Sequence, residues 1–125
     1  MSTLKVNTVQ HNTSGFNNVV QFTDGAGTEN GTLCRAWVNF NGQGTVAIRG
    51  DFNVNTITDS GTGQYTVNFT NAMVDSNYSA LGTMQGGNAY ILTISSTSTN
   101  NCAIYTWTDA SAFIDRPDVY VTIFR

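Results

Sequence analysis

Apolar and polar residues alternate one by one along several stretches of this chain. In one of them, Tyr65, Val67 and Phe69 alternate with three polar residues, Thr66, Asn68 and Thr70. A period of two places successive side chains on opposite faces of a β-strand, so this stretch predicts a strand with one buried and one solvated face. No segment shows a sustained apolar period of 3.6 residues, which would indicate a helix. The pattern predicts an all-β fold.

Eight strands are predicted from residue 34 onward, at the close and regular spacing of an antiparallel β-sandwich of about seven to eight strands. Their ranges are 34–40, 44–49, 52–58, 64–70, 77–84, 89–95, 102–108 and 119–124. Asn41-Gly42 predicts a tight two-residue hairpin, because this dipeptide tolerates positive φ. The run from Asp59 to Gly63 predicts a second turn, and Pro117 one before the last strand.

The first 33 residues differ from the rest of the chain. Residues 4–10 predict one short strand and residues 19–22 form a brief apolar run, whereas residues 11–18 and 23–32 predict loops. Short isolated strands are marginal in water, so they need a sheet edge or a neighbouring subunit. We therefore expect an extended N-terminal arm for attachment or oligomerisation over residues 1–33, followed by a β-sandwich domain over residues 34–125.

Two predicted strands carry apolar side chains on both faces. Trp37 lies on the face opposite to Ala36, Val38 and Phe40, and the last strand has Tyr120, Thr122 and Phe124 opposite Val119, Val121 and Ile123. A strand with two apolar faces is buried on both sides or is covered by another subunit. The pattern therefore predicts self-association.

Charged residues make up only 10% of the 125 residues and the net charge is −3, against about a quarter charged in typical soluble proteins. The basic residues are dispersed, so the chain lacks the clustered Lys and Arg that nucleic-acid binding requires. It also lacks an apolar stretch of about 18 residues and an N-terminal secretory pattern. We expect neither nucleic-acid binding nor membrane insertion.

Groups suited to catalysis or metal binding are scarce. The single histidine, His11, lies in the arm, and the eight acidic residues include no pair that stands out as an acid and base. We expect a non-enzymatic protein with no metal and no cofactor. Cys34 and Cys102 are expected to be small buried thiols, with a disulfide as the less favoured alternative.

Two loops rich in amide and hydroxyl groups provide the candidate binding site. They span residues 85–90 and 95–101, and Tyr105 and Trp107 follow the second. Amide and hydroxyl groups can hydrogen-bond to sugar hydroxyls while an aromatic face stacks on the sugar ring. The candidate receptor-binding residues are Asn88, Tyr90, Tyr105 and Trp107. The alternative is that the three aromatic residues belong to the core or to a subunit interface.

Several segments, covering roughly half the chain, form one recognisable pattern. Its core is Trp37 to Gly42, Gly44 to Arg49, Ile57 to Asp59, Gly61 to Gly63 and Tyr65 to Phe69, with Thr3 to Gln10, Ser14-Gly15 and Val121 to Arg125 as flanking pieces. Together these segments resemble a signature of bacteriophage tail-fibre proteins. The resemblance implies a structural virion protein of the tail or particle surface, made in the host cytoplasm. It further implies a homotrimer that binds other tail or baseplate proteins through its arm and contributes to host-cell attachment. The candidate receptor, a host surface glycan, comes from the two polar loops and not from the resemblance.

Fibre proteins with this signature are commonly longer and have a shaft between arm and tip, whereas here the arm leads almost directly into the signature. A baseplate or capsid-surface decoration protein therefore stays open as an alternative. A lectin-like carbohydrate-binding module is a third interpretation, and an enzyme that degrades the host envelope is the least favoured.

Overall fold

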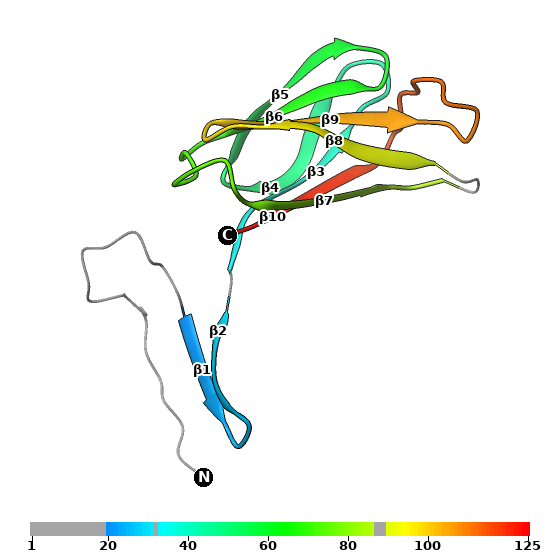
Figure 1. Cartoon of the computed structure of the whole chain (residues 1–125). Helices are drawn as coiled ribbons and strands as arrows, with labels where there is room; N and C mark the ends of the chain where they lie inside the picture. The colour runs from blue at the N-terminus through cyan, green and yellow to red at the C-terminus, as the bar shows by residue number, and fades with distance from the viewer. Residues whose placement is uncertain (1–19, 32, 87–89) are drawn as a thin grey trace. The chain divides into compact units, whose positions relative to one another are not determined.

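The structure is a computed structural model that describes residues 20–31, 33–86 and 90–125 (Figure 1). Within these residues every regular element is a β-strand. The chain divides into two compact units, residues 1–31 and residues 32–125, which are described separately below. The strand predicted over residues 4–10 and the histidine His11 lie outside the described residues.

The first unit contains an antiparallel hairpin of β1 (Val20–Asp24) and β2 (Gly27–Gly31). The sequence predicted a loop over residues 23–32, and this prediction is wrong for β2. The β2 sequence GTENG has no alternation of apolar and polar residues and is poor in strand-forming residues. Its pairing with β1 gives it the strand conformation, and single-residue patterns do not report such pairing.

The second unit is a sandwich of two antiparallel four-stranded sheets, ordered β4-β3-β10-β7 and β5-β6-β9-β8 (Figure 1). The strands are β3 (Cys34–Asn41), β4 (Ala47–Phe52), β5 (Val54–Gly61), β6 (Gln64–Phe69), β7 (Ser79–Met84), β8 (Ile91–Thr97), β9 (Asn101–Trp107) and β10 (Val119–Phe124). The predicted antiparallel β-sandwich of eight strands is thus confirmed. The predicted strand ends differ from the observed ones by up to three residues.

The core fills the space between the two sheets. Its buried apolar side chains are Ala36, Val38, Phe40, Val54, Tyr65, Val67, Phe69, Met73, Cys102, Ile104, Val119, Val121 and Ile123. Phe40 and Tyr65 meet edge to face across the sandwich, with ring centroids 5.2 Å apart, which is a favoured aromatic geometry. The alternation that predicted a buried face for Tyr65, Val67 and Phe69 is therefore confirmed.

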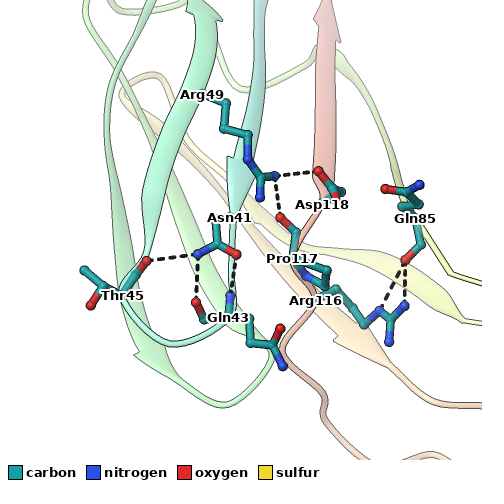
Figure 2. A network of polar contacts seen from close by, with 8 residues as sticks. All are labelled: Asn41, Gln43, Thr45, Arg49, Gln85, Arg116, Pro117 and Asp118. Atoms are coloured by element: carbon teal, nitrogen blue, oxygen red, sulfur yellow. Dashed lines mark hydrogen bonds and ion pairs between the residues drawn. The ribbon is translucent and has the colours of Figure 1, made fainter.

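The connection between β3 and β4 is not the predicted two-residue hairpin. β3 ends at Asn41 and β4 begins at Ala47, and the positive φ falls on Gly44 at 66°. Asn41 Oδ1 accepts the backbone N–H of Gln43 at 3.2 Å, while its Nδ2 donates to the carbonyls of Gln43 (2.8 Å) and Thr45 (3.2 Å) (Figure 2). The hydrogen bonds of the Asn41 side chain thus stabilise a loop that is longer than the predicted hairpin turn.

The turn between β5 and β6 is tighter than the predicted run from Asp59 to Gly63. β5 continues to Gly61, and Asp59 Oδ1 accepts the N–H of Gly61 at 3.0 Å beside an irregularity in the ladder. Only Thr62 and Gly63 lie between the strands, and Gly63 has a φ of 65°. The first three residues of the predicted turn therefore extend β5, and only Thr62 and Gly63 form the turn.

Four loops meet at one end of the sandwich, where the segment 108–118 binds the other three. The N–H of Gly42 donates to the carbonyl of Arg116 at 2.9 Å, and that of Gln85 to Asp118 at 2.9 Å. Arg116 Nη2 donates to the carbonyl of Gln85 at 2.8 Å, and Arg49 Nη1 lies 2.6 Å from Asp118 Oδ1 (Figure 2). Hydrogen bonds and an ion pair therefore hold these loops together at this end of the sandwich.

Both cysteines are free thiols; Cys102 is fully buried and Cys34 partly buried. Burial raises the pKa of Cys102 to about 11. Burial also raises the pKa of Tyr78 to about 12, and its O–H lies within hydrogen-bond distance of the carbonyls of Ser98 (3.1 Å) and Asn101 (2.8 Å). Each group is held neutral by the folded state.

We expect the free energy of unfolding to fall as the pH rises above about 9. Folding raises the pKa of Cys102 from 9 and the pKa of Tyr78 from 10. The neutral groups therefore contribute fully to the free energy of unfolding below these unfolded-state values. Their contribution is lost as the pH rises towards the folded-state values. The loss is at most about 1.4 kcal/mol per pH unit for each group. Urea unfolding between pH 7 and pH 11 measures it, and Tyr78→Phe should show a shallower decline above pH 10. An equal decline in Tyr78→Phe would contradict the assignment.

Candidate functional site

An aromatic cluster lies on the outer face of the sheet β5-β6-β9-β8. Ile91 is directly opposite Trp107, and Thr93 is directly opposite Tyr105, so these four side chains share one face of the β8–β9 pair. Phe113, from the loop after β9, forms an isolated bridge with Trp107 and joins them. We call these five residues the aromatic ledge.

The three rings of the ledge pack against one another. Trp107 and Phe113 are stacked, with centroids 4.0 Å apart and planes at 25°. Tyr105 meets both edge to face, at 6.0 Å from Trp107 and 5.4 Å from Phe113. Trp107 Nε1–H donates to Thr93 Oγ1 at 3.0 Å, which fixes the indole orientation. The ledge is nonetheless accessible, since Ile91 is 52% and Phe113 36% exposed.

Backbone hydrogen bonds hold Phe113 in place. The N–H of Thr108 donates to the carbonyl of Ala112 at 2.8 Å, and the N–H of Ala112 donates back to Thr108 Oγ1 at 3.2 Å. Ser111, with a φ of 60°, completes this tight loop by donating its N–H to the carbonyl of Thr108 at 3.1 Å. The loop therefore presents Phe113 in one position before any ligand binds.

A buried polar cluster anchors the same loop to the core. Asp115 Oδ1 accepts the N–H of Gly63 at 2.7 Å and lies 2.7 Å from the hydroxyl of Tyr65. That hydroxyl is also 2.7 Å from the carbonyl of Gly42. Burial and the hydrogen bond to Asp115 raise the pKa of Tyr65, so its hydroxyl is a neutral donor at neutral pH. The fully buried Thr106 adds a hydroxyl bond to the carbonyl of Ile114.

A shallow surface hollow of about 300 Å³ adjoins the rings. Its lining consists of Ile91, Thr93, Trp107, Thr108 and Ser111, which combines apolar surface with three hydroxyl groups. Polar groups continue along the same sheet face, because Gln64 lies directly opposite Tyr105. Further along, Asn68 Nδ2 donates to Thr58 Oγ1 at 2.9 Å and to Thr56 Oγ1 at 3.1 Å. None of the described residues that line the hollow is charged.

The structure brings together two of the four residues predicted to bind a receptor, Tyr105 and Trp107. Tyr90 is not part of this cluster: its ring lies under the guanidinium of Arg116, 4.2 Å from the centroid, and its hydroxyl accepts from Arg116 Nη1 at 3.3 Å. Asn88 lies outside the described residues. The predicted loop 95–101 is shorter than expected, because β8 runs to Thr97.

Sequence reasoning missed Phe113 and Ile91. Phe113 lies in an irregular segment, so no periodicity marks it, and only the loop's hydrogen bonds bring it to Trp107. Ile91 was detectable in principle, since it precedes Thr93 by two residues on the predicted strand and so shares its face. The observed cross-strand register was needed to place both residues beside the rings.

A second, larger groove of about 510 Å³ is lined by Leu33, Cys34, Arg35, Phe52, Asn53, Thr70 and Asn71. Asn53 is occupied structurally, because its Nδ2 donates to the carbonyls of Arg35 (3.0 Å) and Asn71 (3.1 Å). Its Oδ1 accepts the N–H of Asn71 at 2.8 Å. The side-chain amide of Asn53 therefore stabilises the fold and is not available to a ligand. The aromatic ledge is the better candidate site.

Among the described residues, no three His, Cys, Asp or Glu side chains lie close enough together to hold a metal ion. In the same part of the chain no helix has the length and apolar character needed to cross a lipid bilayer. Comparison with known proteins finds no matching family model, no matching curated protein and no matching solved structure.

Proposed function

We propose that this chain is a non-enzymatic attachment protein that binds host surface carbohydrate through the aromatic ledge. The observation that supports this function is the prearranged cluster of the half-buried rings of Tyr105 and Trp107 with the exposed ring of Phe113, beside a hydroxyl-lined hollow. The core does not need Phe113, because the core is filled from the other face of the sheet. A tight loop and the polar cluster around Tyr65 nevertheless hold this exposed ring in place.

Sugars match this chemistry. A pyranose ring has an apolar C–H face that packs on an aromatic surface and hydroxyl groups that exchange hydrogen bonds with Thr, Ser and Gln side chains. Thr93, Thr108 and Ser111 provide such hydroxyls around the hollow. Because the five described residues that line the hollow carry no charge, a neutral sugar fits better than an acidic one.

The setting of this binding function comes from the sequence resemblance to tail-fibre proteins. On that basis the protein is a virion component of the tail or particle surface, a homo-oligomer with the expected threefold symmetry, whose arm binds other tail or baseplate proteins. The baseplate or decoration role is the second candidate. It is favoured by the exposed apolar side chains Trp37, Phe52 and Leu81 on the outer face of the other sheet, which suit contacts with protein.

Trp107→Ala is expected to weaken binding of the full chain at least tenfold, because stacking residues at the centre of a site contribute more than about 1.4 kcal/mol. The probe is an array of bacterial surface glycans, followed by titration calorimetry with the best ligand. Phe113→Ala should act in the same direction.

Trp37→Ala is the matched control, since it removes a 42% exposed tryptophan from the outer face of the other sheet. It should leave affinity unchanged, with the fold of all variants checked by circular dichroism. If the unaltered chain binds none of the glycans, or if Trp37→Ala weakens binding as much as Trp107→Ala, the proposed site is wrong. Localisation in electron-microscopy density of whole particles distinguishes tail tip, baseplate and capsid surface.

A further inference from the structure

We propose that β7 is a pairing strand, through which two copies of this chain join into one continuous eight-stranded antiparallel sheet. β7 (Ser79–Met84) is the outermost strand of its sheet, and within the described part of the chain its only ladder partner is β10 (Figure 1). The inference rests on the backbone of this strand and on neighbouring outer-face residues, and it is independent of the aromatic ledge.

Edge strands of native sheets usually carry a device that prevents pairing, such as a charge, a proline or a bulge. Three edges of this sandwich have one. β4 carries Arg49 and Asp51, β5 has ladder irregularities at both ends, and β8 has one between Ile94 and Ser96. β7, with the sequence SALGTM, has no charge and no proline, and its register with β10 is unbroken. It is therefore the unprotected edge.

The ladder shows which backbone groups face the open edge. The N–H of Gln85 donates to the carbonyl of Asp118 at 2.9 Å, and these residues continue the register in which Met84 is opposite Val119. Hydrogen-bonded and non-hydrogen-bonded pairs alternate in an antiparallel ladder. Thr83 and Leu81 therefore bond to β10, whereas Ala80, Gly82 and Met84 direct their N–H and C=O groups outward.

A second copy of β7 satisfies these groups. When the strands run antiparallel about a twofold axis at Gly82, Ala80 of each copy lies opposite Met84 of the other, and three residues from each copy exchange both backbone bonds. Twofold pairing brings like residues together, which penalises any charged strand. The absence of charge on β7 removes this penalty and favours self-pairing over pairing with the charged edge β4.

An apolar row on the outer face points to the same occupant. Phe52, Trp37, Thr122 and Leu81 lie directly opposite one another on β4, β3, β10 and β7. The row ends at the open edge with Leu81, which is 57% exposed. In the joined sheet Leu81 lies opposite Thr83 and diagonal to Leu81 of the second copy, within reach of its side chain. The row then continues across both copies.

The test is sedimentation velocity of the full chain between 5 and 200 µM, as an order-of-magnitude range suited to a small interface. A twofold contact gives an even number of chains, which is a dimer, or a hexamer where the threefold contact also forms. Ala80→Pro removes an outward N–H and spares the ladder to β10, and Leu81→Lys brings like charges together. Each should halve the mass of the assembly.

Two lysine variants are the matched controls. Ala47→Lys places the same charge on the opposite edge, and Phe52→Lys places it at the far end of the apolar row; both should retain the even-numbered assembly. The proposal fails if the unaltered chain is a monomer or a trimer, or if Leu81→Lys leaves the assembly intact. It also fails if Phe52→Lys dissociates the assembly as completely as Leu81→Lys, because the sheets would then associate face to face. Leu81 is exposed, so Leu81→Lys decides the matter even if Ala80→Pro does not fold.

Discussion

Gly63→Ala is expected to lower the free energy of unfolding by about 3–4 kcal/mol, combining backbone strain with overpacking. Gly63 has a φ of 65°, a backbone conformation that residues other than glycine rarely adopt. An added Cβ would lie 2.6 Å from the carbonyl oxygen of Thr106 and 2.8 Å from the backbone nitrogen of Ile114. Both obstacles are backbone atoms held by hydrogen bonds, so neither can move aside cheaply.

Gly44→Ala is the matched control. Gly44 has nearly the same φ, 66°, but an added Cβ meets no atom within 4 Å. Its cost should be the strain alone, about 1 kcal/mol. Urea unfolding followed by tryptophan fluorescence measures both variants. Equal losses at the two positions would show that the contacts around Gly63 relax easily.

Gly42→Ala is expected to cost about 2–3 kcal/mol, through overpacking alone. The φ of Gly42 is not positive, but an added Cβ would lie 2.7 Å from the Tyr65 hydroxyl oxygen and 3.1 Å from the carbonyl oxygen of Arg116. The Tyr65 ring cannot swing away, because it is 1% exposed and packs edge to face on Phe40.

Gly50→Ala serves as the control for this position, since its added Cβ would make only ordinary contact with Trp37, at 3.5 Å. We expect a change within about 0.5 kcal/mol. Combining Gly42→Ala with Tyr65→Phe should cost less than the sum of the single changes, because the phenylalanine removes the nearest obstacle. Strict additivity in unfolding experiments would mean that Gly42 is not required for the approach of Tyr65.

These two glycines also connect the fold to the candidate site. Gly42 and Gly63 admit the hydroxyl of Tyr65 and the carboxylate of Asp115, which hold the loop that carries Phe113. A variant that disturbs either glycine should therefore loosen the aromatic ledge as well as destabilise the sandwich.

The strands were predictable because burial of one face imposes a period of two on the sequence, as in Tyr65, Val67 and Phe69. The turns were predicted less well. Asn41-Gly42 has the composition of a tight hairpin, yet Asn41 bonds to Gln43 and Thr45 while Gly42 packs under Tyr65. Local residue preference does not report a requirement that is set by a neighbour 23 positions away.

The candidate site shows the same division. Tyr105 and Trp107 were predicted as binding residues from their types and their place after a polar loop, and Tyr90, predicted with them, lies apart from their cluster. Tyr90 directly precedes Ile91, whose side chain belongs to the ledge, and alternation sends its ring to Arg116 instead. Phe113 had no periodic signal, because its position depends on a loop closed by Thr108 and Ala112.

The amino-acid sequence by itself determined that the chain forms strands, which faces of those strands are apolar, and how few charges its surface carries. These properties follow from local alternation and composition. Only the tertiary structure decided the order β4-β3-β10-β7 and β5-β6-β9-β8, and with it which residues meet in the ledge and which edge is left open. Strand order and register arise from contacts between distant segments, and a pattern of period two is the same for every order in which the strands can pair.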